Sequence, residues 1–169
     1  DLTARSVAIG TGVDQSRFQI KADEHKFASD IPKQMLLCVP SGFDYRKNVA
    51  GLLHVYSLLS DTIRETYPLY LVGRVGEHDY AKLRQMSEEL GIINQVKFYG
   101  FVDDDALIQM YQKAACFVFP SIYEGFGLPA LEAVLCGCPT LAVNRSSIPE
   151  VLGKGNGLVD PDDHASWAR

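Results

Sequence analysis

The sequence predicts an α/β domain with a doubly wound, mainly parallel sheet and helices on both faces. Short apolar runs rich in branched residues alternate with longer amphipathic stretches about five times, and most of the runs end in Gly, Pro or a polar turn. The 169 residues, 47% hydrophobic and 22% charged, suit one hydrophobic core. We therefore expect a single domain over residues 1–169.

Each short apolar run has the length and composition of a buried strand. The five clear candidates are Met35–Pro40, Leu69–Gly73, Val96–Gly100, Cys116–Pro120 and Thr140–Val143, with weaker ones at Val7–Gly10 and Gly157–Asp160.

The stretches between the runs have helical periodicity. Val49–Ser60 and Ala81–Leu90 place apolar residues three and four apart, which predicts two helices packed on the sheet. Asp103 opens the next helix with an acidic first turn, and Pro129 marks the start of another. A last helix begins at about His164, and Asp14–Pro32 is the longest expected loop.

Composition excludes several classes of protein. The net charge of -5 argues against nucleic acid as a partner. Four cysteines, mostly within apolar runs, favour reduced thiols packed in a core and a cytoplasmic location. No run approaches the roughly 20 apolar residues of a membrane-spanning helix. The chain opens on Asp1 and we interpret it as a fragment of a longer protein.

Ligands of open parallel sheets bind at the carboxyl ends of the strands, in loops that lead into helices. The loop after Phe119 carries Gly125 and Gly127, which allow close backbone approach, between the carboxylates of Glu124 and Glu132. A plain glycine turn with a solvated Glu124 is the alternative. Glu132 weighs against it, because a charge in so apolar a helix needs a partner or a purpose.

The loop after Val39 carries two adjacent cations, Arg46 and Lys47. A guanidinium fork and a lysine point charge together would suit a diphosphate. An ordinary solvated turn is the alternative for this loop taken alone. Its place on the same sheet edge as the Glu124 loop favours a site.

Taken together, these motifs resemble the family 4 retaining glycosyltransferases over nearly the whole chain. The matching motifs are Arg46-Lys47-Asn48, the Leu-Val-Gly turn ending at Gly73, Phe98 to Val102, Glu124-Gly-Phe-Gly-Leu with Glu132, Gly137-Cys-Pro139 and Glu150. The resemblance implies a Rossmann-like fold, namely the C-terminal, donor-binding half of the two-domain GT-B architecture, with the N-terminal acceptor domain absent from this chain.

The resemblance also implies roles. Glu124 would hold hydroxyls of the donor sugar, Glu132 the ribose, and Lys47 the leaving diphosphate, with Arg46 as the second cation. The family's usual second cation falls on Gly42 here, which is a departure. The remaining donor-binding residues expected from the motifs are Gly73, Gly100, Phe101, Val102, Gly125, Phe126, Gly127 and Leu128.

No metal and no cofactor are expected. Asp103 to Asp105 contains an Asp-x-Asp pattern that binds metal in another glycosyltransferase fold, but the acidic run fits a helix N-terminus better. The scattered histidines lack the spacing of metal ligands.

The expected function is transfer of a hexose from a nucleotide-diphosphate sugar to a glycan or glycolipid, with retention at the anomeric carbon. The motif pair suggests GDP-mannose, whereas base, sugar, acceptor, linkage and oligomeric state are not specified by these residues. This chain alone should bind donor and turn nothing over. Peripheral association with the inner face of a membrane would come through the absent domain. The alternatives are a sugar-nucleotide epimerase of the same architecture and a non-catalytic nucleotide-sugar-binding module.

Overall fold

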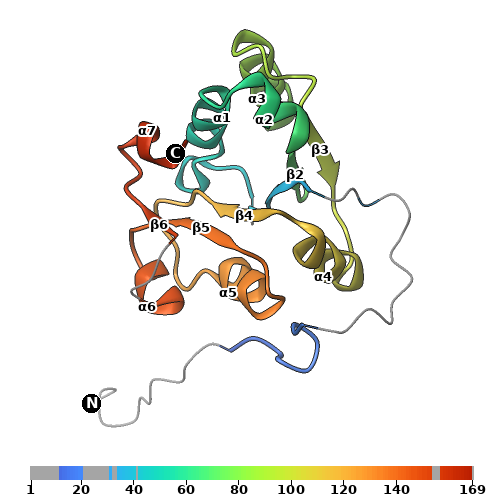
Figure 1. The fold of residues 1–169 in the computed structure, drawn as a ribbon, viewed down its shortest axis with the longest axis vertical. Coiled ribbons are helices and arrows are strands. Elements are labelled where there is room, and N and C mark those ends of the chain that lie inside the picture. Colours follow the sequence, from blue (N-terminus) through green and yellow to red (C-terminus); the bar gives the residue numbers. More distant parts are fainter. Residues whose placement is uncertain (1–11, 21–30, 32–33, 41, 154–156, 169) are drawn as a thin grey trace.

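The computed structural model describes residues 12–20, 31, 34–40, 42–153 and 157–168 (Figure 1). The weak strand candidate Val7–Gly10 and much of the expected loop Asp14–Pro32 lie outside these residues.

The sheet has six parallel strands, so the predicted α/β class is confirmed. The strands are β1 (Leu36–Cys38), β2 (Leu69–Val72), β3 (Val96–Gly100), β4 (Cys116–Phe119), β5 (Thr140–Val143) and β6 (Leu158–Val159). Their spatial order is β3-β2-β1-β4-β5-β6. Pro40 and Pro120, which closed two predicted runs, lie beyond the strand ends, as expected for residues without a backbone N–H.

The described residues form seven α-helices and a short 3-10 helix, all of which lie between strands except the last, which follows β6. They are η2 (Tyr45–Lys47), α1 (Val49–Ser57), α2 (Asp61–Thr66), α3 (Glu77–Glu89), α4 (Asp104–Lys113), α5 (Leu128–Leu135), α6 (Ile148–Leu152) and α7 (His164–Trp167). The helix predicted over Val49–Ser60 is three residues too long, because Ser60 is extended and caps α2 through the amide of Ile63. Helices α2 and α6 were not predicted.

Helices cover both faces of the sheet, which confirms the doubly wound arrangement. One core cluster contains buried side chains of α4, α5 and α6, below the sheet in Figure 1. The other contains those of α1, α3 and α7, above the sheet. Asp103 caps α4 by accepting the amide of Ala106 at 2.8 Å, so the acidic run is a helix N-terminus, as predicted.

Strand order places a switch point between β1 and β4. The chain runs outward from β1 through β2 to β3, then returns across the sheet to β4 and runs the other way to β6. The helices that follow β1 and β4, α1 and α5, therefore pack on opposite faces of the sheet, and the point where they part is the usual ligand position in such sheets. The loops that lead into these helices carry Lys47 and Glu124.

Candidate functional site

The loops that follow β1 and β4 are joined by a backbone hydrogen bond. The amide of Ile122 donates to the carbonyl of Arg46 at 2.8 Å. Each loop is thereby held against the other at the switch point, and the residues that follow on each side, Lys47 and Glu124, are brought together.

Lys47 and Glu124 form an ion pair. The Lys47 ammonium donates to Glu124 Oε1 at 2.8 Å, and the two side chains are only 9% and 14% exposed. Charges so little exposed are costly unless they are paired. The ammonium has three donors, so it can contact an anionic ligand while it keeps the carboxylate in place. The sequence predicted that the two loops share one edge of the sheet, and the structure in addition brings these two side chains into direct contact.

Arg46 pairs with Asp44 rather than with Glu124. Its Nε and Nη2 each donate to a carboxylate oxygen of Asp44 at 2.9 Å, and both side chains are largely exposed. The paired Arg46 guanidinium lowers the pKa of Asp44. Arg46 contributes to the site through its backbone carbonyl, which accepts a hydrogen bond from the amide of Ile122.

Two serines after β5 support the Glu124 loop. Ser146 donates to the carbonyl of Glu124 at 2.7 Å and accepts its amide at 3.3 Å. Ser147 lies within hydrogen-bonding distance of the carbonyls of Glu124 and Phe126, at 3.1 and 3.0 Å. The sequence analysis missed both residues. The available signal was that they follow a strand at the same edge of the sheet as Glu124.

Helix α5 begins at the site. Gly127 precedes it with φ 96° and ψ 43°, a left-handed conformation that glycine adopts without strain. A Cβ at Gly127 would lie 2.5 Å from Cδ1 of Ile148, whereas a Cβ at Gly125 would meet nothing within 4 Å. Pro129 has no N–H, and the amides of Ala130 and Leu131 bond the carbonyl of Gly127, so the amides of Gly127 and Leu128 are the ones that the start of α5 leaves for a ligand.

A cavity of about 330 Å³ adjoins this loop. It is lined by Gly125, Phe126, Leu131, Ser147, Glu150 and Val151. The lining brings the glycine-rich loop together with Glu150 of α6, a residue already noted among the family motifs.

The carboxylate of Glu132 forms a hydrogen bond with a side chain of α4. The hydroxyl of Tyr111 lies 3.2 Å from Glu132 Oε2 and donates to it. Burial raises the pKa of Glu132, while the Tyr111 hydrogen bond opposes this shift. The carboxylate of α5 is thus half-buried with one neutral donor, which leaves lone pairs for a ligand hydroxyl.

The raised pKa of Glu132 has a consequence for stability. The folded protein binds this proton more tightly than the unfolded chain, so the free energy of unfolding should fall as pH rises from the ordinary value of 4.5 through the raised one. Glu132→Gln should therefore stabilise the protein at pH 7 and lose that advantage below about pH 4. Urea unfolding at both pH values measures this. Glu77→Gln controls for the loss of one exposed charge. An advantage that persisted in acid would assign the effect to packing.

The turns that follow β2 and β3 lie together. The amide of Gly73 donates to the carbonyl of Gly100 at 2.8 Å, and both glycines have positive φ, 149° and 77°. The ring of Phe101 is 66% exposed, with the guanidinium carbon of Arg74 at 4.6 Å from its centroid, and Val102 packs against the core. A large exposed ring beside a cation is a ready stacking surface for a planar ligand.

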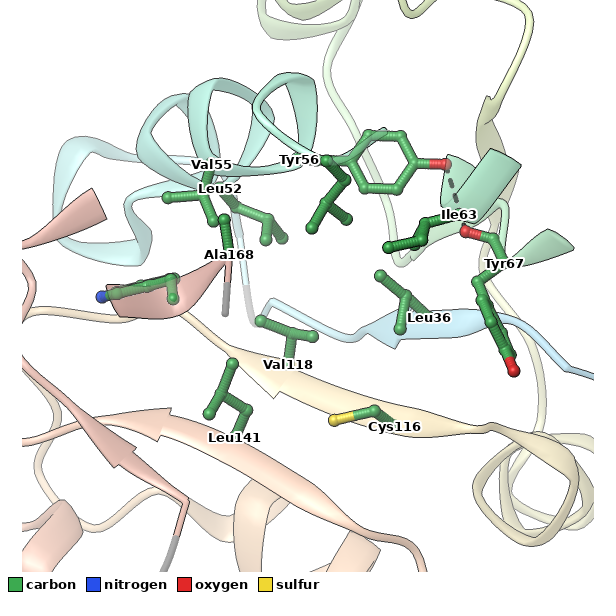
Figure 2. Close-up of a pocket in the computed structure, with 12 residues that line it drawn as sticks. Leu36, Leu52, Val55, Tyr56, Ile63, Tyr67, Cys116, Val118, Leu141 and Ala168 are labelled. Carbon is green, nitrogen blue, oxygen red and sulfur yellow. Dashed lines mark hydrogen bonds between the residues drawn. The ribbon is translucent and has the colours of Figure 1, made fainter. Parts of the chain in front are cut away.

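A separate apolar cavity of about 240 Å³ lies between α1, α2, α7 and the strands (Figure 2). Its lining includes Leu36 and Cys116, the first residues of β1 and β4. It is therefore near the amino ends of these strands, away from the loops after their carboxyl ends, and we do not assign it to the candidate site.

Neither a metal cluster nor a membrane span emerges from the described part of the chain. Within it, no three potential ligand side chains of His, Cys, Asp or Glu gather closely enough to hold an ion. Over the same residues, no helix has both the length and the apolar character to cross a bilayer. The four cysteines all lie within the described residues and form no disulfide, and Cys38, Cys136 and Cys138 are buried, in agreement with the expected core packing.

The fold and the site together define a class: a doubly wound α/β domain whose switch point carries a cation, carboxylates and a helix N-terminus suited to a phosphorylated ligand. The chain belongs to the glycosyl transferases group 1 family, whose model matches residues 21–169. The predicted family is therefore confirmed.

Individual relatives agree with this assignment. The chain is 37% identical over 152 residues to the serotype-specific mannosyltransferase WbdA of Escherichia coli, covering 89% of this chain and 18% of the relative. It is 44% identical over 118 residues to O-antigen chain mannosyltransferase B of Escherichia coli, covering 70% of this chain and 31% of the relative. The chain thus spans less than a third of the length of either relative.

A solved structure gives the same result for the fold. The crystal structure of Anabaena HepE in complex with UDP and glucose matches with a TM-score of 0.73 at 27% identity, over 93% of this chain and 44% of that one. The fold of a glycosyltransferase is thereby shown across nearly the whole of the present chain.

Proposed function

We propose that this chain is the donor-binding domain of a retaining hexosyltransferase that uses a nucleotide-diphosphate sugar. The observation that carries the proposal is the Lys47–Glu124 pair at the switch point, beside the N-terminus of α5. Two mannosyltransferase relatives favour mannose as the hexose, and the structure of HepE with UDP and glucose favours a nucleotide-sugar donor.

Each proposed role follows from chemistry at the site. Lys47 and the first amides of α5 would stabilise the diphosphate as negative charge develops on it, with Arg46 as a second cation if it exchanges Asp44 for phosphate. Glu124 would accept hydrogen bonds from sugar hydroxyls, and Glu132, held by Tyr111, from the ribose. Backbone groups of Gly125, Phe126, Gly127 and Leu128 would line the sugar and diphosphate, and Gly73, Gly100, Phe101 and Val102 would frame the base.

The proposed reaction needs no covalent intermediate with the protein. The acceptor oxygen would form a bond to the anomeric carbon on the face from which the diphosphate departs. The bond from that carbon to the phosphate oxygen would break, and the acceptor proton would pass to the leaving diphosphate. Lys47 would compensate the charge of this leaving group throughout, which is the kind of electrostatic stabilisation that dominates such transfers.

Acceptor recognition is proposed to need more than these residues. The chain covers 18% of one mannosyltransferase relative and 31% of another, and the family resemblance implies a second α/β domain that binds a glycan or glycolipid. Peripheral attachment to the inner face of a membrane would then be a property of that domain.

A titration of this chain tests the donor site. GDP, GDP-mannose and UDP-glucose are titrated by calorimetry into the parent, Glu132→Ala and Glu124→Ala. Glu132→Ala removes the proposed contact to the ribose. It should weaken GDP binding by about 1.5–3 kcal/mol, the usual contribution of a hydrogen bond to a charged group. Glu124→Ala should instead reduce the preference among sugar nucleotides, because its proposed partners are sugar hydroxyls.

Other outcomes of the titration would count against specific parts of the proposal. Absence of binding of any nucleotide to the parent would reject the donor site. Two variants that bind like the parent would reject the roles of the two carboxylates while leaving the family intact. Glu77→Ala, in the first turn of α3, supplies the matched control for loss of an exposed carboxylate.

A further inference from the structure

A cavity of about 370 Å³ lies on the other side of the η2 turn from Glu124. It is bounded by the β1–α1 loop and α3, and its lining includes Phe43, Asp44, Tyr45, Asn48, Asp79 and Lys82. None of the residues proposed to hold the donor lines it. Both the loop and the first turns of α3 follow the carboxyl ends of strands, so the cavity opens on the ligand edge of the sheet.

Two polar side chains that line this cavity, those of Asn48 and Asp79, are half-buried and have no side-chain partner among the described residues. The side chain of Asn48 forms no capping bond to α1, and Asp79 makes no ion pair or side-chain hydrogen bond within the described ranges. Asn48 adopts φ 49°, and its amide lies against Gly51, where a Cβ would collide with it. A half-buried amide and carboxylate without partners favour a ligand that supplies hydrogen-bonding groups.

The rest of the lining fits a neutral sugar better than a second anion. Tyr45 is 82% exposed and offers an aromatic ring with a polar tip, while Phe43 packs into the core beneath. The charges of the lining balance, because Arg46 already pairs with Asp44 and the remaining charged groups are one carboxylate, Asp79, and one ammonium, Lys82, so no surplus of cations favours phosphate. The volume lies within the roughly 300–1,000 Å³ of small-molecule sites.

The η2 turn links this cavity to the chemistry. Tyr45 and Asn48 line the cavity, while Lys47 between them points its ammonium at Glu124. A chain of sugars that enters the cavity would therefore lie within one turn of backbone from the proposed transfer site.

We propose that this cavity binds a hexose unit of the glycan acceptor, with Asn48 and Asp79 as hydrogen-bonding groups and Tyr45 as a ring against which the sugar packs. The inference rests on the proposed function, since it names an acceptor for the same transfer. It gives this domain a share in acceptor recognition, in addition to donor binding.

Solution NMR of this chain tests the proposal. An α-linked mannobiose is titrated into the parent, with GDP titrated separately. Amide shifts at Tyr45, Asn48 and Lys82 are expected with mannobiose, and Asp79→Ala should weaken its binding on the order of tenfold while leaving GDP binding unchanged. Gly51→Ala, which would displace the Asn48 amide, should weaken mannobiose in the same direction. Glu77→Ala, on the same turn of α3 but outside the lining, should bind mannobiose like the parent.

Three results would overturn the inference. They are no mannobiose shifts around the cavity in a chain that still binds GDP, equal loss in the Glu77→Ala control, and displacement of mannobiose by inorganic phosphate at this cavity. Because GDP reports on the donor site and mannobiose on the cavity, failure of the acceptor inference can be told from failure of the proposed function.

Discussion

Replacing Lys47 with Met is expected to lower turnover of the transferase by on the order of 10²–10³-fold, the usual cost of removing one donor aimed at a developing charge. Methionine keeps much of the aliphatic chain but leaves Glu124, only 14% exposed, without its cation. Removing one partner of a buried pair typically destabilises a protein by about 3–5 kcal/mol. Urea unfolding of this chain measures the loss of stability, and a sugar-transfer assay of the whole transferase measures the loss of turnover.

A double-mutant cycle separates stability from catalysis at this pair. Glu124→Gln in the Lys47→Met background removes the orphaned charge, so stability should recover substantially while turnover stays low. Arg46→Met is the matched control, because an exposed pair such as Arg46–Asp44 is usually worth about 0–1 kcal/mol. A Lys47→Met protein with normal turnover would contradict the electrostatic role.

Gly127→Ala should have the second large effect, on the start of α5. The residue has φ 96°, where a side chain is strained, and the new methyl would lie 2.5 Å from Ile148. Backbone strain of this kind typically costs about 1–3 kcal/mol, and the contact also requires the buried Ile148 side chain or the helices around it to shift. We expect lower stability and weaker GDP binding, because the first amides of α5 would shift.

Gly125→Ala is the control for this substitution, since a methyl there meets nothing within 4 Å and the residue has no positive φ. Thermal unfolding and GDP titration of both variants compare the two glycines directly. Equal behaviour of the two would mean that the left-handed turn is not what positions α5.

Local patterns were sufficient to predict most of the fold. Apolar runs of four to six residues between helical stretches predicted the strands, and β3 and β5 have the predicted bounds, although β3 is an edge strand in which only Val96 is buried. The helices α2 and α6 were missed because segments of six and five residues hold too few turns for a periodic pattern. For α2, the serine cap at Ser60 was the available signal.

The candidate site was predicted less completely. The rule that ligands bind at the carboxyl ends of parallel strands identified the two loops that carry Lys47 and Glu124. These residues are 77 positions apart, and their contact depends on the adjacency of β1 and β4. A sequence does not reveal strand order directly. Arg46 was expected beside a phosphate because of its charge. Asp44 lies only two residues away in the sequence, and the Arg46 guanidinium pairs with its carboxylate instead. The hydroxyls of Ser146 and Ser147 bond to backbone carbonyls of the Glu124 loop. Every residue has a backbone carbonyl, so the sequence of that loop does not indicate these contacts.

The contact between Lys47 and Glu124 also constrains how this domain can diverge. A lineage that loses only one of the two charges is left with the other nearly buried and unpaired, so a single substitution is penalised even when transfer is no longer selected. The two residues should therefore be kept together or lost together. A descendant that has given up sugar transfer could therefore be recognised by a joint replacement at both positions, whereas retention of both charges is enforced by stability alone and is not by itself a sign of sugar transfer.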